Sequence, residues 1–349
     1  MKILYLSKSR IEYSVNAVYI KGLEQNGVNV TCFYASRKWM RSYFEAINFL
    51  KKEGQGSDIV VVGYDSPGFV VLARLFGKKK VVYNALCSVY ERLIVSRNLA
   101  PRFSLRAFYY WLLDFFAVRS ANLVMLESKS QMDYFKKLFL VPDKKLFRAW
   151  TGVDEDRFYL DPAIKKNDIF TVIFRGVLMP EAGGEFVVRA AKILENQPIQ
   201  FIMAGDGMEL NKVKNLIAEL KPQNLKLITD FLSYDKLRIM MQKSHLSLGQ
   251  LSNHERLERT IPHKCYESLV MGLPYLTASN TGILELLTPD ETCLICNPAD
   301  AKSLAEEILW AKNHPREIEM IAENGYQLYQ TKLKSNILAR NLLDRISAI

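Results

Sequence analysis

The chain has 349 residues, of which 49% are apolar and 24% charged, the composition of an ordinary globular protein. This length exceeds the usual size of one hydrophobic core, so it predicts two domains. The sequence contains no apolar run of about 18 residues, which excludes a membrane-spanning helix. Met1–Ser7 is too short and too strand-like for a secretion signal, and the five cysteines are scattered. We therefore expect a cytoplasmic protein with free thiols.

The net charge of +10 is unevenly distributed. Residues 1–156 hold 24 Lys and Arg against 14 Asp and Glu, whereas residues 157–349 hold 23 of each kind. A basic half joined to a neutral half indicates that the first half meets an anionic partner. An anionic membrane surface or a phosphorylated substrate fits this charge. Nucleic acid is not expected as a partner, because the chain has no recognisable nucleic-acid-binding module.

Short apolar segments alternate with helical patterns in the first half. The expected strands are 2–6, 28–34, 58–63, 80–84 and 123–126, and the expected helices are 14–26, 39–52, 67–76, 102–119 and 130–138. Strands that alternate with helices and are apolar on both faces predict a parallel, doubly wound sheet.

The alternation restarts after Thr151–Asp154. The expected strands are 169–174, 199–204, 225–228, 246–249, 275–278 and 293–295, and the expected helices are 184–195, 209–220, 233–244, 262–271, 284–287, 301–313 and 316–349. We predict an α/β protein of two Rossmann-like, doubly wound domains, residues 1–156 and 157–335. A hinge is expected near residues 155–168, and residues 336–349 are expected to form a helix that crosses back to the first domain.

The segment that begins at Arg259 is the most informative one. Thr260 can cap the following helix and Pro262 fits its first turn. Free N–H groups at such a helix end suit a phosphate. Arg259 and Lys264 are locally unfavourable there unless an anion joins them. Glu267, one turn later, could accept two vicinal hydroxyls. The alternative is an amphipathic helix with a solvated Lys–Glu pair.

This segment and three others, in the same order, resemble the family 4 retaining glycosyltransferases of GT-B fold. The other three are Thr151–Phe158, Phe174–Gly183 and Ala204–Gly207. The resemblance covers residues 120–310 and is weak before them. It implies two domains that face each other across a cleft, with both substrates between them.

The implied reaction moves a hexosyl group from a nucleoside diphosphate-sugar to a hydroxyl of a glycan or lipid-linked acceptor. Transfer retains the anomeric configuration and needs no metal and no cofactor, and the expected setting is polysaccharide or glycolipid biosynthesis. We expect a protein that is peripheral at the inner face of the membrane.

The resemblance also implies a set of site residues. The catalytic residues are Arg259, Lys264 and Glu267; the donor-binding residues are Arg175, Gly176, Gly205, Asp206, Gly207, Thr260 and Glu267; the acceptor-side residues are Ser7, Lys8, Asp65 and Asn84, to which Ser9 adds a further side chain. Asn84 stands where the family often has a histidine.

The chain departs from the family in the charges of the site. Val177 and Ala182 occupy positions where the family usually has Arg and Lys, and Arg259 occupies the position of the earlier of two glutamates. Arg175, Arg259 and Lys264 can replace the missing positive charge. The lost glutamate usually contacts the transferred sugar.

Two rival functions follow from these departures. A GT-B-fold epimerase acting on the sugar nucleotide needs acid and base residues in the first domain, where Asp65 and Glu91 are the clear candidates. A noncatalytic sugar-nucleotide-binding subunit fits the loss of the usual charges.

Other patterns favour structural roles. Gly205 and Gly207 lack the third glycine of a dinucleotide fingerprint and do not follow a first strand. Cys293 and Cys296 have no second pair of ligands, so we expect them in the core rather than at zinc. The histidines form no Ser/His/Asp grouping.

Two stretches place cations beside clustered aromatic residues. They are Arg102–Arg119 and Arg37–Phe44. Such segments suit the headgroup region of an anionic membrane. The alternative is a buried interdomain helix with basic ends, because aromatic stripes are often core.

Overall fold

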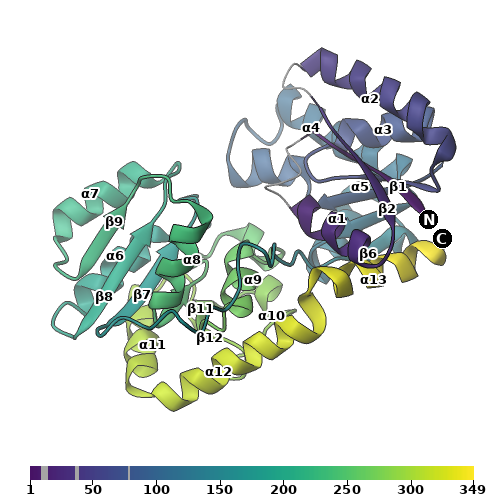
Figure 1. Ribbon diagram of the computed structural model, residues 1–349. Helices are drawn as coiled ribbons and strands as arrows, with labels where there is room; N and C mark the ends of the chain where they lie inside the picture. The colour runs from purple at the N-terminus through teal and green to yellow at the C-terminus, as the bar shows by residue number, and fades with distance from the viewer. Residues whose placement is uncertain (9–14, 36–38, 78) are drawn as a thin grey trace. The chain divides into compact units, whose positions relative to one another are not determined.

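The computed structural model describes residues 1–8, 15–35, 39–77 and 79–349. The chain forms two compact units, of which the first combines Met1–Asp154 with Leu333–Ile349 and the second is Glu155–Lys332. Each is an α/β unit built on its own sheet (Figure 1). None of the helices in the described ranges is long and apolar enough to span a membrane.

The first unit contains a six-stranded parallel sheet with the order β2-β1-β3-β4-β5-β6. The strands are β1 (Lys2–Ser7), β2 (Asn29–Tyr34), β3 (Ile59–Val62), β4 (Lys80–Leu86), β5 (Leu123–Leu126) and β6 (Leu146–Arg148). β1, β3, β4 and β5 are buried almost throughout, as expected for strands with helices on both faces.

Alternate side chains of this sheet enter two separate cores. Leu4 and Val60 join the core that α2 (Trp39–Glu53), α3 (Pro67–Phe76), α4 (Leu105–Ser120) and α5 (Lys129–Phe139) cover. Ile3 and Val61 point the other way and meet α1 (Val15–Gln25) and α13 (Ser335–Ser347). This is the doubly wound arrangement that the sequence predicts. α13 packs along α1, so the last helix of the chain completes the first unit.

The second unit repeats the design with the strand order β12-β11-β10-β7-β8-β9, again parallel throughout. The strands are β7 (Phe170–Arg175), β8 (Ile199–Ala204), β9 (Leu225–Ile228), β10 (Leu246–Leu248), β11 (Tyr275–Ala278) and β12 (Leu294–Cys296).

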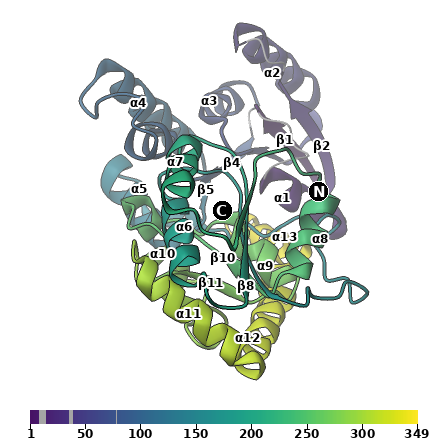
Figure 2. The ribbon, with the colours of Figure 1, turned by 90° about the vertical axis from the view of Figure 1, so that its left-hand side faces the viewer.

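One core of this unit is formed with α6 (Gly184–Ile193), α7 (Leu210–Leu220), α11 (Ala301–Asn313) and α12 (Pro315–Leu328). The ribbons of these helices are labelled in Figure 2. The remaining helices are α8 (Tyr234–Lys243), α9 (His263–Val270) and α10 (Thr281–Leu284). α9 packs against β11 and α12, which fixes the helix that carries Lys264 and Glu267.

The structure corrects several expected elements. The helix expected over 316–349 is interrupted by a π-helical turn at Tyr329–Leu333, and the chain passes from the second unit to the first there. α10 ends at Leu284, where the sequence predicts a short helix to begin. β6 and a π-helical segment at Glu91–Ser96 were not expected.

Candidate active site

Two glycine turns follow β7 and β8 and lie against each other. Gly176 has φ +113°, a conformation that favours glycine. A Cβ at Gly205 would lie 2.0 Å from the carbonyl oxygen of Gly176, so only glycine lets the two turns meet. The Asp206 carboxylate accepts a hydrogen bond from the Gly207 N–H at 2.7 Å. The Asp206 side chain thus stabilises the turn in which it lies, and the close contact of Gly205 with Gly176 holds the two turns together.

Lys264 lies beside these turns, in the first turn of α9. Its side chain is buried, its ammonium lies 4.0 Å from the centre of the Phe174 ring, and Gln250 Oε1 is 3.4 Å away. In the described chain, no carboxylate lies within ion-pairing distance of this ammonium. Burial and the nearby Arg175 guanidinium together lower the pKa of Lys264 to about 7, although the more distant Glu267 and Glu181 carboxylates raise it. An anion bound here would raise that pKa again.

Arg175 and Glu267 form a buried ion pair next to Lys264. Arg175 Nη1 lies 2.5 Å from Glu267 Oε2, and Arg175 Nη2 donates to the carbonyl oxygen of Lys264 at 3.2 Å. The Arg175 side chain is 5% exposed and that of Glu267 15%. Arg175 therefore closes a structural pair, while the Glu267 carboxylate keeps an edge that a ligand can reach.

The loop with Arg259 and Thr260 is held by the chain that follows β11. Gly282 packs directly on it, because a Cβ at Gly282 would lie 2.8 Å from the Thr260 nitrogen. Glu258 accepts a hydrogen bond from the Thr281 N–H at 3.1 Å. Thr260 does not cap α9 as the sequence predicts. Pro262 occupies the cap position, and the buried Thr260 hydroxyl has no hydrogen-bond partner in the structure.

A second buried ion pair was not found from the sequence. Arg256 Nη1 donates to Glu181 Oε1 at 2.8 Å, and both side chains are largely buried. Ala182, at the position where the family usually has a lysine, is fully buried in the core, whereas Val177 is exposed. The sequence shows only that Glu181 lies in a loop with a proline and a glycine. Such a loop does not indicate that its partner is an arginine 75 residues later.

Cys293 and Cys296 are both buried, in agreement with a core role. Burial raises the pKa of both thiols to about 12, so neither is poised as a thiolate.

On the acceptor side, Ser7 and Asn84 do not reach a ligand surface. Both are buried, and Ser7 accepts a hydrogen bond from Asn16 Nδ2 at 3.2 Å. Asn16 Oδ1 accepts from the Tyr5 hydroxyl at 3.0 Å, and Asn84 Nδ2 lies 3.5 Å from the same hydroxyl. These two predicted acceptor residues thus belong to a buried polar network under the ends of the strands. Ser9 lies outside the described residues.

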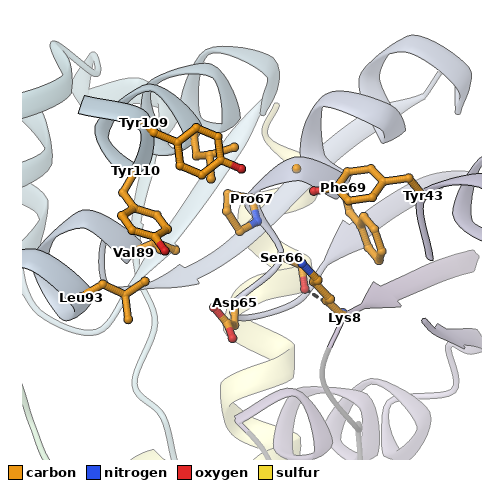
Figure 3. A pocket seen from close by; sticks show the side chains of 12 residues that line it. Lys8, Tyr43, Asp65, Ser66, Pro67, Phe69, Val89, Leu93, Tyr109 and Tyr110 are labelled. Atoms are coloured by element: carbon orange, nitrogen blue, oxygen red, sulfur yellow. Dashed lines mark hydrogen bonds between the residues drawn. The ribbon is translucent and has the colours of Figure 1, made fainter. Parts of the chain in front are cut away.

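Lys8 and Asp65, in contrast, line a pocket of about 230 Å³ in the first unit (Figure 3). Tyr109 and Tyr110 of α4 lie on one side of it and Tyr43 of α2 on the other. Aromatic rings beside a carboxylate and an ammonium can bind a polar ring compound by its apolar face and its hydroxyls.

The backbone at Asp65 is strained. Its φ is +62°, a left-handed conformation that is uncommon outside glycine. The carboxylate forms an ion pair with Arg92 through Oδ1, yet its side chain remains 42% exposed. Strain of this kind is often kept where it aims a functional side chain.

Glu91, the other acid/base candidate, is fully buried. Gln131 Nε2 donates to Glu91 Oε2 at 2.7 Å, and Glu91 does not line the pocket. Asp114 was not singled out by any sequence motif, and it accepts hydrogen bonds from the Ser88 hydroxyl at 2.7 Å and the Tyr90 N–H at 2.9 Å. Burial raises the pKa of Asp114 to about 6, although these donors lower it. It fixes the loop that forms one wall of the pocket.

The aromatic stretch on α4 divides into two parts. Trp111 and Phe115 are partly buried and pack against the core of the first unit. Phe103, Leu105 and Phe108 are exposed. In the stretch Arg37–Phe44, Phe44 is exposed, and residues 37–38 lie outside the described ranges.

Residues 157–328 match the family model described as glycosyl transferases group 1. The second unit is therefore similar to the group 1 glycosyl transferases over nearly its whole length. The chain is also 29% identical over 139 residues to a 2-deoxystreptamine N-acetyl-D-glucosaminyltransferase of Niallia circulans. This alignment covers 39% of the chain and 34% of the relative. It is 30% identical over 196 residues to a UDP-Gal:alpha-D-GlcNAc-diphosphoundecaprenol alpha-1,3-galactosyltransferase of Escherichia coli, covering 51% and 47%. The chain thus spans half or less of the length of these two relatives.

The fold of the whole chain is similar to that of solved structures. HepE of Anabaena in complex with UDP-glucose superposes with a TM-score of 0.74 over the full length of both chains, at 16% identity. The expected likeness to the family 4 glycosyltransferases and the GT-B fold is thereby confirmed.

Proposed function

We propose that the protein transfers a hexosyl group from a nucleoside diphosphate-sugar to a hydroxyl of a glycan or lipid-linked acceptor. Transfer proceeds with retention and without a metal or cofactor, at the cytoplasmic face of an anionic membrane. The observation that carries the proposal is the buried Lys264 ammonium, which has the Gly176 turn beside it and no carboxylate within ion-pairing distance in the described chain.

A bound diphosphate supplies the counter-ion that the Lys264 ammonium lacks. A buried ammonium without a counter-ion is costly, and the oxygens of a diphosphate supply the missing charge. The first N–H groups of α9 offer further donors. Glu267 lies one turn further along the same helix, at a place to accept the two hydroxyls of a ribose.

In the proposed reaction, the bond between the sugar C1 and the diphosphate oxygen breaks, and a bond between C1 and the acceptor oxygen forms. The acceptor's hydroxyl proton is released, and the products are a glycoside and a nucleoside diphosphate. Lys264 and Arg259 stabilise the negative charge that grows on the departing diphosphate. Asp65 in the tyrosine-lined pocket of the first unit orients the acceptor hydroxyl.

The named relatives support this choice of substrates. The Escherichia coli relative acts on a sugar linked to diphosphoundecaprenol, and the Anabaena structure holds UDP-glucose. The excess of ten positive charges in residues 1–156 supports an anionic membrane as the place of action.

The test is incubation with a panel of labelled nucleoside diphosphate-sugars, with and without membrane extract. The proposal expects label to move from the donor to an extractable glycan or lipid only when extract is present. Conversion of the sugar nucleotide into an epimer without extract would instead show the epimerase. Calorimetric binding of a donor without any turnover would show a noncatalytic subunit.

A further inference from the structure

The N-terminal end of α4 carries an exposed apolar tip. Phe103 is fully exposed, Leu105 is 89% exposed and Phe108 55%. Ser104 caps the helix by accepting a hydrogen bond from the Ala107 N–H at 3.2 Å. Leu105 and Phe108 are therefore displayed by the capped first turns of the helix, and Phe103 lies in the turn directly before the cap. We call Arg102, Phe103, Leu105, Arg106 and Phe108 the α4 tip.

The apolar side chains of the α4 tip and Arg102 line a shallow groove of about 380 Å³. Trp111 also lines it, and this ring stacks on Phe108 with ring centres 5.9 Å apart and on Phe115 at 5.1 Å. Trp111 thus has its inner side on the core and its outer side toward the groove. Tryptophan in that position is favoured at the boundary between apolar and aqueous surroundings.

The exposed charges of the segment that carries the α4 tip are of one sign. Arg97, Arg102 and Arg106 are exposed, and the sequence from Arg92 to Leu113 contains no Asp or Glu. Exposed large apolar side chains alone would fit many partners. Their combination with an uninterrupted set of cations selects a surface that is both apolar and anionic, which is the headgroup region of a membrane with anionic lipids.

We propose that the α4 tip inserts into anionic membranes, with Phe103, Leu105 and Phe108 below the headgroups and the arginines among the phosphates. The membrane contact is argued independently of the proposed function, and only the inference about a lipid-linked acceptor rests on that function. α4 also lines the tyrosine pocket through Tyr109, Tyr110 and Leu113, so one helix joins the membrane contact to that pocket. A lipid-linked acceptor with its sugar head in the pocket is the substrate that this arrangement fits.

Co-sedimentation of the full chain with vesicles tests the proposal. Vesicles of phosphatidylcholine with phosphatidylglycerol are compared with vesicles of phosphatidylcholine alone, at low and high salt. We expect Phe103→Ser/Leu105→Ser/Phe108→Ser to abolish the salt-resistant part of the binding. Arg102→Gln and Arg106→Gln should each weaken binding about fivefold and mainly at low salt. Phe231→Ser/Met320→Ser, two equally exposed residues of the second unit, is the matched control and should bind as the parent does.

Insertion is distinguished from adsorption by Phe103→Trp with brominated lipids, which quench tryptophan within the acyl region. We expect stronger quenching than for Phe231→Trp. Equal quenching, or binding that the triple serine variant keeps, would overturn the proposal. So would a concentration-dependent dimer that the triple variant abolishes, because the tip would then be an interface between copies. UDP binding, measured by calorimetry, tests the proposed function separately, because we assign it to the second unit. Thermal melts confirm that each variant is folded.

Discussion

Arg175 of β7 and Glu267 of α9 are joined by an ion pair of 2.5 Å that is almost closed to water. The carboxylate that we assign to the ribose is therefore also the counter-ion of a buried guanidinium. Removing it has two effects that must be separated, one on ligand binding and one on the fold.

We predict that Glu267→Ala lowers the free energy of unfolding by about 3 kcal/mol, because it leaves Arg175 buried without its counter-ion. Glu267→Gln should be less damaging to stability, since the amide oxygen can still accept a hydrogen bond from Arg175, but it should lose donor affinity as well. Chemical denaturation and calorimetry measure the two effects. A Glu267→Ala variant as stable as the parent would show that the pair does not contribute to folding. Glu306→Ala, at an exposed ion pair with Lys302, is the control and should change little.

The affinity for UDP should fall as the pH rises from 7 to 9. The pKa of Lys264 is about 7 in the unliganded protein, so an anion that needs the charged form must bind together with a proton above that pH. The terminal phosphate of UDP is already ionised there, since its last pKa is about 6. We expect a loss of up to about tenfold per pH unit.

Calorimetry in buffers of different ionisation enthalpy should detect this proton uptake at pH 8. Lys264→Arg should bind UDP without it, because guanidinium stays charged. If the pH dependence is the same in Lys264→Arg, another group is responsible for it.

The same lysine should destabilise the unliganded protein. Its folded-state pKa lies below the unfolded value, so the unfolded chain binds more protons between pH 7 and about 10.4. The contribution of Lys264 to stability therefore improves as the pH rises through this window. We predict that Lys264→Met raises the free energy of unfolding at pH 7 by roughly 1–3 kcal/mol while it weakens UDP binding. The gain should shrink at pH 9.5, and a gain that does not change with pH would have another origin.

Asp65→Asn should impair use of the acceptor and leave donor binding intact. Asn tolerates the left-handed backbone at this position, and its amide oxygen can still accept the hydrogen bond from Arg92, so the change removes charge without new backbone strain. A lost charged hydrogen bond to an acceptor hydroxyl predicts a rise in the acceptor KM of about tenfold or more. Tyr109→Leu, on the opposite wall of the pocket, should raise the same KM. An unchanged acceptor KM in both variants would place the acceptor elsewhere.

The features predicted correctly from the sequence are those that a local residue pattern determines. The buried strands, such as Ile59–Val62, were recognisable because an apolar run between turn residues has few alternatives. β6 was missed because it is three residues long and follows charged residues. The partner of Glu267 could not be found, since Arg175 is 92 residues away and nothing in either segment specifies the contact. Asn84 and Ser7 have the right residue types and positions, but neighbouring side chains use their polar atoms.

The last helix should be required for the first unit and dispensable for the second. In α13, Leu342 is fully buried in a core that it shares with α1, and a Cβ at Gly22 of α1 would lie 2.0 Å from the Ser335 carbonyl oxygen. The two helices thus touch along their backbones. Leu342→Ala should cost about 2–5 kcal/mol and Gly22→Ala should also destabilise, because neither backbone can move aside without opening that core. Hydrogen exchange should accelerate at β1 and β3 and not at β7 and β8. Leu304→Ala, equally buried in α11, should give the reverse pattern. Equal acceleration in both sheets for Leu342→Ala would show that the two units unfold as one.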